Sequence, residues 1–274
     1  MTKKPGIIGR SYTALILLFL YAPIAILIIF SFNSTRSRTV WTGFTFDWYR
    51  SLFFDSSIMN AFYTSLIIAL VSAVVATIAG TFAAVGFYNM RSRWRTPLMH
   101  VNNIPMMNAD IATGVSLSLL FISIGSVLKF NLGFGTLLLA HITFNIPYVV
   151  LSIMPKLRQL DNNLVDAACD LGCTWFKAFW KVIVPEIRPG IINGLIIAFT
   201  LSIDDFVISY FTAGGNVMTL PMQIFAMTRR RISPEINALS TILFLTVLAL
   251  LLVFNIRQSR QEDKQIKSAK ALNR

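Results

Sequence analysis

Six long and almost uncharged apolar stretches constrain the fold of this 274-residue chain more than any other feature. A helix needs about 20 mostly apolar residues to cross a bilayer, and each stretch meets that length. The predicted spans are 11–32, 62–88, 97–124, 134–155, 190–212 and 236–256. The sequence therefore predicts an all-α, polytopic membrane protein with six transmembrane helices, forming one transmembrane domain over residues 1–274.

The composition agrees with a membrane location. Only 13% of the residues are charged and the mean hydropathy is +0.66, whereas a soluble domain is about 25% charged. With six spans both termini lie on one side, and that side carries 17 Lys and Arg residues against seven on the other. Because basic loops stay in the cytoplasm, we expect cytoplasmic N- and C-termini. Arg229–Arg231 is a local exception, and a short helix or re-entrant segment is expected over 216–232.

The longest predicted cytoplasmic connection between spans, residues 156–188, has the pattern of a helix–glycine–helix unit. Asp161 is placed to cap a first helix that continues through Leu171. Gly172 can adopt the left-handed conformation that ends it, and Thr174 can cap a second helix. The sequence predicts a compact knob outside the membrane.

Apolar side chains follow one face of the first helix of this knob, and aromatic ones fill the second. They are Leu164, Val165, Ala168 and Leu171, followed by Trp175, Phe176, Phe179 and Trp180. An apolar surface in water usually marks a protein interface. An amphipathic anchor lying on the membrane surface is the alternative.

The same loop resembles the EAA loop of inner-membrane subunits of bacterial ABC importers. The residues that match are Asp166, Ala167, Ala168, Gly172, Val182, Val184 and Pro185, with Asp in place of the family's Glu. The resemblance implies a type I, MetI-like permease with a five-helix core over 62–256. It also implies that 161–185 is a coupling-helix loop that docks on a separate ATPase subunit, with the matched residues in that contact.

Motifs in the remaining chain resemble C-type permease subunits of spermidine/putrescine importers. They are SFNST (31–35), IPMMNADI (104–111), AHITFNIPYVV (140–150), FTLSIDDFVISYF (199–211) and SPEINALSTIL (233–243). This resemblance implies a bacterial inner-membrane location, a heterodimer with a second permease, two ATPase subunits and an external polyamine-binding protein. ATP and Mg²⁺ would belong to the ATPase, because this chain lacks a G-x-x-x-x-G-K-[ST] loop. We therefore expect a transport subunit with no cofactor of its own.

Three carboxylates inside the predicted spans are the candidate cargo-binding groups. At about 1.5 Å per residue, Asp110 and Asp204 both lie roughly 20–23 Å from the inner surface of the hydrocarbon core, and His141 falls in the same zone. Charges at such depth are usually functional. We expect Asp110 and at least one of Asp204 and Asp205 to line a cation path, while the other faces the partner or caps a helix break.

Aromatic residues near these carboxylates could also face a polycation, because aromatic rings attract cations. The candidates are Tyr148 and Tyr210, with Phe206 and Phe211 as further possibilities. The alternative is a structural role for the acidic residues, satisfied by Ser202, Thr200 or a backbone amide freed near Pro105.

Two other functions stay open from the sequence. One is an ABC permease for an amino acid, sugar or ferric ion, because the cargo is chosen largely by the external binding protein. The other is a stand-alone cation carrier, against which the knob over 161–185 argues. No nucleic-acid or metal motif is present, and Cys169 and Cys173 are expected to be small apolar fillers.

Overall fold

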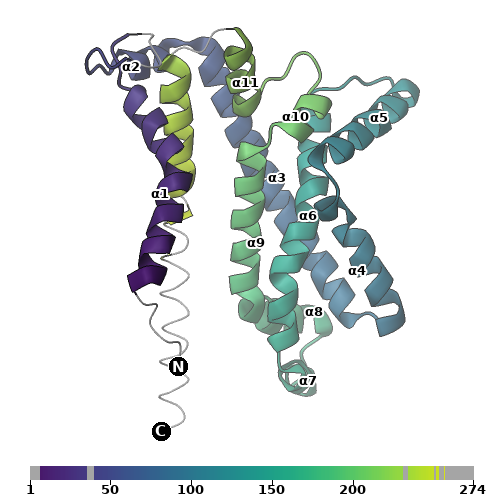
Figure 1. The fold of residues 1–274 in the computed structure, drawn as a ribbon. Helices are drawn as coiled ribbons and strands as arrows, with labels where there is room; N and C mark the ends of the chain where they lie inside the picture. The colour runs from purple at the N-terminus through teal and green to yellow at the C-terminus, as the bar shows by residue number, and fades with distance from the viewer. Residues whose placement is uncertain (1–6, 36–39, 231–233, 250, 253–255, 257–274) are drawn as a thin grey trace. The chain divides into compact units, whose positions relative to one another are not determined.

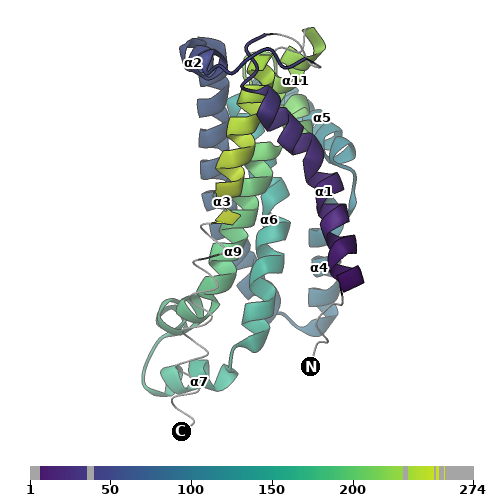
Figure 2. The ribbon, with the colours of Figure 1, turned by 60° about the vertical axis from the view of Figure 1, so that its left-hand side comes forward.

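The computed structural model describes residues 7–35, 40–230, 234–249, 251–252 and 256, and these form helices joined by short loops (Figures 1 and 2). The helices are α1 Ile7–Phe30, α2 Asp47–Phe54, α3 Ser56–Asn89, α4 Ser92–Met107, α5 Asp110–Leu128, α6 Phe134–Gln159, α7 Asn162–Asp170, α8 Trp175–Ala178, the π-helical segment η1 Phe179–Ile183, α9 Val184–Asp204, α10 Val207–Thr212 and α11 Leu220–Arg230. An apolar helix, Pro234–Ala249, follows.

Five of the described helices are long and apolar enough to cross a membrane: Gly9–Phe30, Ser56–Asn89, Asp110–Leu128, Phe134–Gln159 and Trp175–Asp204. The sixth predicted span coincides with the shorter helix Pro234–Ala249, and its last part falls largely outside the described residues. The short helix expected over 216–232 is confirmed by α11. The basic tail beyond residue 256, Arg231 and the first lysines lie outside the described residues.

The described part of the chain divides into two compact units, one within residues 1–59 and 223–249 and the other within residues 60–222. In the first unit, the SFNST motif ends α1 and organises the loop that follows. Asn33 is buried, its side-chain amide donates to Val40 O, and its Oδ1 accepts from the backbone N–H and the hydroxyl of Thr42. Phe32 stacks on Phe44 beside it.

The second unit is built around α6, which has the most buried face of the membrane helices. Figure 1 shows α9 running beside α6, and Gly80 places part of α3 against α6 at Val149. Glycines bring these helices close together. A Cβ on Gly80 of α3 would lie 2.7 Å from Val149 Cγ1, and one on Gly190 of α9 would lie 3.0 Å from Ser152 O. Gly80 therefore allows a close contact between α3 and α6.

The third predicted span, 97–124, is wrong as a single helix, because the chain forms α4 and α5 with a break between them. Asn108 and Ala109 are extended, with ψ of 152° and 137°. Pro105 cannot donate the backbone hydrogen bond of the last turn of α4, which weakens the helix there. Asp110 then begins α5, where a carboxylate favours a helix N-terminus.

The fifth predicted span, 190–212, is also wrong at both ends. It stops at Asp204, and α10 follows after a two-residue break. At its start, α9 continues from α8 through η1, in which Val184 N–H bonds to Phe179 O. Pro185 lacks an N–H and crowds the preceding turn, and a wide π-turn accommodates it without ending the helix.

Candidate functional site

The two helix breaks of the second unit lie close together. A Cβ on Gly114, one turn into α5, would lie 3.1 Å from Phe211 Cδ2 and 3.4 Å from Ile208 Cα of α10. The first turn of α5 therefore packs directly on α10. This contact brings the break before Asp110 beside the break after Asp204.

Asp110 and Asp204 are both exposed at these breaks. Within the described part of the chain, neither side chain makes a hydrogen bond or an ion pair. Tyr148 of α6 is half-buried and lies within electrostatic reach of Asp110. Tyr210, exposed on α10, packs its ring against Phe206 at a centroid distance of 5.6 Å. Two carboxylates and two tyrosines from the sequence prediction thus surround the paired breaks.

Asp205 is in a different position from its neighbour, because both of its oxygens are bonded. Its Oδ1 accepts from Ile208 N–H at 3.2 Å, and its Oδ2 accepts from the backbone N–H and the hydroxyl of Ser209 at 2.7 and 2.9 Å. His141 Nε2 lies 3.0 Å from Ser209 Oγ and 3.5 Å from Asp205 Oδ2. Asp205 therefore caps α10, the alternative role predicted for one of the pair.

The polar residues proposed as structural partners of the aspartates bond elsewhere. Ser202 pairs with Ser72 of α3 at 3.0 Å and accepts from Asn145 of α6 at 2.7 Å. Thr200 donates to Ile196 O in its own helix. The partner of Asp205 that sequence reasoning missed is Ser209. The sequence does contain a signal for this contact, because Ser209 follows Asp205 by four residues. At that spacing an Asp side chain can accept a hydrogen bond from a residue in the first turn of the helix that follows it.

The helix–glycine–helix unit forms as predicted. Asp161 accepts from Asn163 N–H and caps α7, and Thr174 accepts from Lys177 N–H at the start of α8. Gly172 has a φ of +85°, and the N–H of Cys173 bonds back to Ala168 O. Such bonding ends a helix with a left-handed residue, a conformation that glycine adopts without strain.

The apolar surface of this unit is partly internal. Phe179 is buried, stacked on Phe82 of α3 at 5.7 Å and on Trp175 at 5.9 Å, so the prediction that the whole aromatic face projects into water is wrong for this residue. Five large side chains stay exposed: Leu164, Leu171, Trp175, Phe176 and Trp180. Leu171 is 87% exposed at the end of α7.

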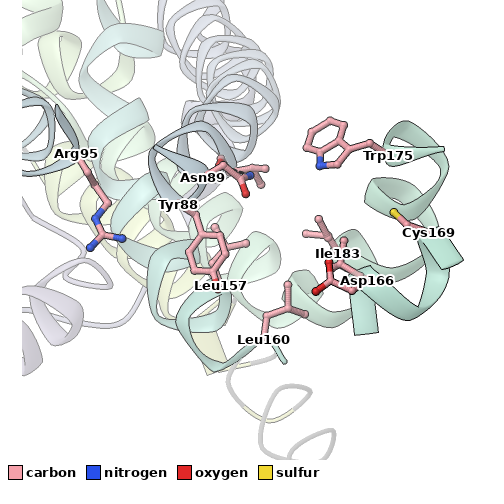
Figure 3. A pocket seen from close by; sticks show the side chains of 11 residues that line it. Tyr88, Asn89, Arg95, Leu157, Leu160, Asp166, Cys169, Trp175 and Ile183 are labelled. Carbon is pink, nitrogen blue, oxygen red and sulfur yellow. Dashed lines mark hydrogen bonds between the residues drawn. The ribbon is translucent and has the colours of Figure 1, made fainter. Parts of the chain in front are cut away.

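A cavity of about 640 Å³ lies behind α7 (Figure 3). Buried apolar side chains form part of its lining: Val85, Leu157, Leu160 and Ile183. In Figure 3, Arg95 of α4 lies on one side and Asp166 and Trp175 lie on the other. The cavity therefore touches α7, the first turn of α4, and the α8–η1 segment that leads into α9.

Of the predicted coupling residues, Asp166 lines this cavity. Ala167, Gly172 and Pro185 are exposed, and Ala168 and Val182 are half-buried. Cys169 and Cys173 are free thiols, and Cys169 is exposed in the cavity wall rather than an apolar filler. No cluster of three or more metal-ligating side chains occurs among the described residues.

Residues 76–267 match the family described as binding-protein-dependent transport system inner membrane component. The chain belongs to this family. The matched region contains the cavity, the coupling-loop residues and both helix breaks. All of the candidate functional residues therefore lie within the region that matches the family.

Curated relatives cover most of this permease. It is 42% identical to the putrescine transport system permease protein PotI of Escherichia coli strain K12, over 82% of this chain and 81% of that protein. It is 40% identical to the spermidine/putrescine transport system permease protein PotC of the same strain, over 86% and 87%. The PotC protein of Haemophilus influenzae is 38% identical, over 86% and 90%.

Solved structures of similar fold come from ABC transporters. A bacterial transporter involved in the import of the acidic polysaccharide alginate matches with a TM-score of 0.69 and 15% identity, covering 91% of this chain and 93% of that one. The MetNI methionine transporter in an inward-facing conformation matches with a TM-score of 0.60 and 16% identity, covering 74% and 95%. These matches show that the permease has the fold of ABC importer permeases, and it is a multi-pass membrane protein of the transport subunit class.

Proposed function

We propose that this permease forms half of the path through which an ATP-driven bacterial importer passes polyamines such as putrescine and spermidine. The observation that carries the proposal is the pair of exposed carboxylates, Asp110 and Asp204, at two adjoining breaks of membrane helices. The names of the relatives at about 40% identity support the cargo class.

The chemistry of the breaks suits a slender polycation. Carboxylates attract its ammonium groups, and the faces of Tyr148 and Tyr210 offer cation–π contacts that are worth about 0.5–2 kcal/mol each. A charged side chain in a membrane segment is costly without a partner or a role. A passing cation gives Asp110 and Asp204 a partner that the described residues of this chain do not provide.

The coupling surface of the proposed importer is α7 with the residues around it. Asp166, Ala167, Ala168 and Gly172 would contact a groove of an ATPase subunit, and Val182 and Pro185 would join that surface to α9. The exposed apolar side chains of α7 and α8 support a protein partner. The complete complex would contain a second permease, two ATPase subunits that bind ATP and Mg²⁺, and an external polyamine-binding protein. Both termini of this chain would lie in the cytoplasm.

ATP-dependent uptake by vesicles that contain the complete complex tests the proposal. We expect uptake of labelled spermidine or putrescine, and no uptake of a neutral amino acid or a sugar. Asp110→Asn and Asp204→Asn should each lower polyamine uptake about tenfold, because a lost charge-assisted contact is worth at least that factor. Glu186→Gln, which neutralises an exposed carboxylate at the other end of α9, serves as the matched control.

Three results would contradict parts of this proposal. Normal polyamine uptake in both Asn variants would remove the carboxylates from the path. Uptake of the amino acid or the sugar instead would leave an ABC permease with another cargo. Failure of the permease to co-purify with an ATPase subunit, together with uptake that needs no ATP, would indicate a stand-alone carrier.

A further inference from the structure

His141, Asp205 and Ser209 form a hydrogen-bonded cluster between α6 and the first turns of α10, which we call the α10 clasp. His141 is 1% exposed, Ser209 is fully buried, and the Asp205 side chain is 9% exposed. The clasp joins two helices that are far apart in sequence, and it lies directly beside the exposed Asp204.

The directions of the hydrogen bonds in the clasp are fixed by its chemistry. An ionised carboxylate can only accept, so Ser209 Oγ–H donates to Asp205 Oδ2. With its one proton used, Ser209 Oγ must accept from His141, which therefore carries a proton on Nε2. His141 Nδ1 is buried and has no hydrogen-bond partner among the residues that the structure describes. In a neutral imidazole ring Nδ1 carries only a lone pair. In a charged ring Nδ1 would carry a buried N–H without an acceptor, which costs more free energy, so the arrangement favours the neutral ring.

The bonding also separates the clasp from a hydrolytic triad. In a triad, the histidine uses one ring nitrogen for the serine and the other for the carboxylate. Here Nε2 faces both Ser209 and Asp205, and the serine hydroxyl bonds to the carboxylate itself. The three groups fasten helices together and are not arranged as a nucleophile and base.

The clasp holds one end of α10, and a second bond holds the other. Thr136 Oγ1 of α6 donates to Thr212 O at 2.8 Å, in the last turn of α10. Between these ties, α10 contacts α5 at Gly114, one turn after Asp110. The placement of α10 on α6 therefore sets the positions of both breaks that carry the exposed carboxylates.

We propose that His141 and Ser209 are positioning residues for cargo passage, acting through Asp205 to hold the break at which Asp204 is presented. This inference rests on the proposed function in assigning Asp204 to the cargo path. Asp205 has no contact with cargo in this arrangement. It fixes the helix break, and its neighbour supplies the free charge.

A labelling experiment tests the clasp without any cargo. The probe is a cysteine at Ile208, which is fully buried in α10, in a complex whose Cys169 and Cys173 have been replaced by serine. His141→Asn should raise the rate of reaction with a small maleimide about tenfold, the effect of losing a hydrogen bond to a charged network. His141→Gln should leave the rate low, because its longer side chain carries the same amide donor to the position of Nε2. Equal rates in the Asn and Gln variants would overturn the proposed clasp.

Transport measurements on the same two variants test the positioning role. In assembled complexes with unchanged ATP hydrolysis, His141→Asn should lower polyamine uptake per ATP about tenfold, and His141→Gln should retain it within about twofold. Equal uptake in both variants would overturn the positioning role. Absence of polyamine uptake by the wild-type complex would instead contradict the proposed function, and the labelling result would still decide whether the clasp exists.

Discussion

Two adjacent aspartates show how a helix break gives the same residue type two different roles. Asp204 ends α9 and is exposed, whereas Asp205 turns back and accepts from the first amides of α10. In a continuous helix, neighbouring side chains point about 100° apart and differ in height by only about 1.5 Å. The break adds a change of backbone direction, so Asp205 accepts hydrogen bonds through both oxygens while Asp204 bonds to none of the described residues.

At the residue scale, we expect Asp205→Asn to destabilise the permease and Asp204→Asn to have little effect on stability. An Asn at 205 keeps one acceptor but puts an amide where Oδ1 or Oδ2 now accepts, and the loss of such a cap costs about 0.5–2 kcal/mol. The apparent melting temperature of the purified complex measures the difference. Equal shifts for the two variants would contradict the division of roles between these residues.

At the scale of helices, glycine residues allow α3 and α9 to pack closely against α6. Gly80 brings α3 onto α6 at Val149, and Gly190 and Gly194 bring α9 onto the same helix. With lipid on the outer faces, such contacts rely on close van der Waals packing. α6 is consequently the buried centre of its unit, with fully buried Val149, Val150 and Ile153.

At this scale, Gly80→Val should destabilise the permease by about 1–3 kcal/mol, because the new side chain overlaps Val149 in a packed interface. Gly86→Val is the control on the same helix, since nothing lies within 4 Å of a Cβ at that position. Thermal unfolding of the purified complex gives the comparison, and Val149→Ala should partly restore the Gly80 variant. A Gly86 variant as unstable as the Gly80 variant would count against this account of the contact.

Sequence reasoning found the local features of these elements and missed the ones that depend on distant partners. The caps of α7 at Asp161 and Gly172 were predictable, because both are set by residues within one turn. The break after Met107 was missed, and the break after Asp204 was raised only as an alternative for one of the two aspartates, since apolar residues continue on both sides of each. The second break is stabilised by His141, which lies on another helix, and depth alone placed that residue near the carboxylates without showing its bond.

At the scale of the whole molecule, two helical segments begin beside the cavity behind α7, and they lead to the breaks at Asp110 and Asp204. α4 starts beside it with Arg95 and ends at the break before Asp110. The α8–η1–α9 segment starts beside it with Trp175 and ends at Asp204. A partner that presses on α7 therefore acts next to the first residues of both helical segments.

At this largest scale, Leu171→Asp should weaken binding of the ATPase subunit about tenfold, because it puts a charge in the most exposed apolar position of the α7 unit. Asn163→Ala is the control, an exposed polar residue on the same helix. The amount of ATPase subunit that co-purifies with the permease is the measurement. Unchanged co-purification of the Leu171 variant would show that the ATPase docks elsewhere.

The fixed length of α9 has a consequence for how the family's members can diverge. Its 21 residues join the wide turn of η1 to the clasped break, over about 30 Å at 1.5 Å per residue. Inserting one residue would lengthen it by only about 1.5 Å but would rotate Asp204 by about 100° relative to η1. Both ends are anchored, so neither can turn to compensate. In α9, the direction in which Asp204 points relative to η1 is therefore more sensitive to an insertion than the length of the helix is. We expect tolerated insertions in the loops rather than between Val184 and Asp204.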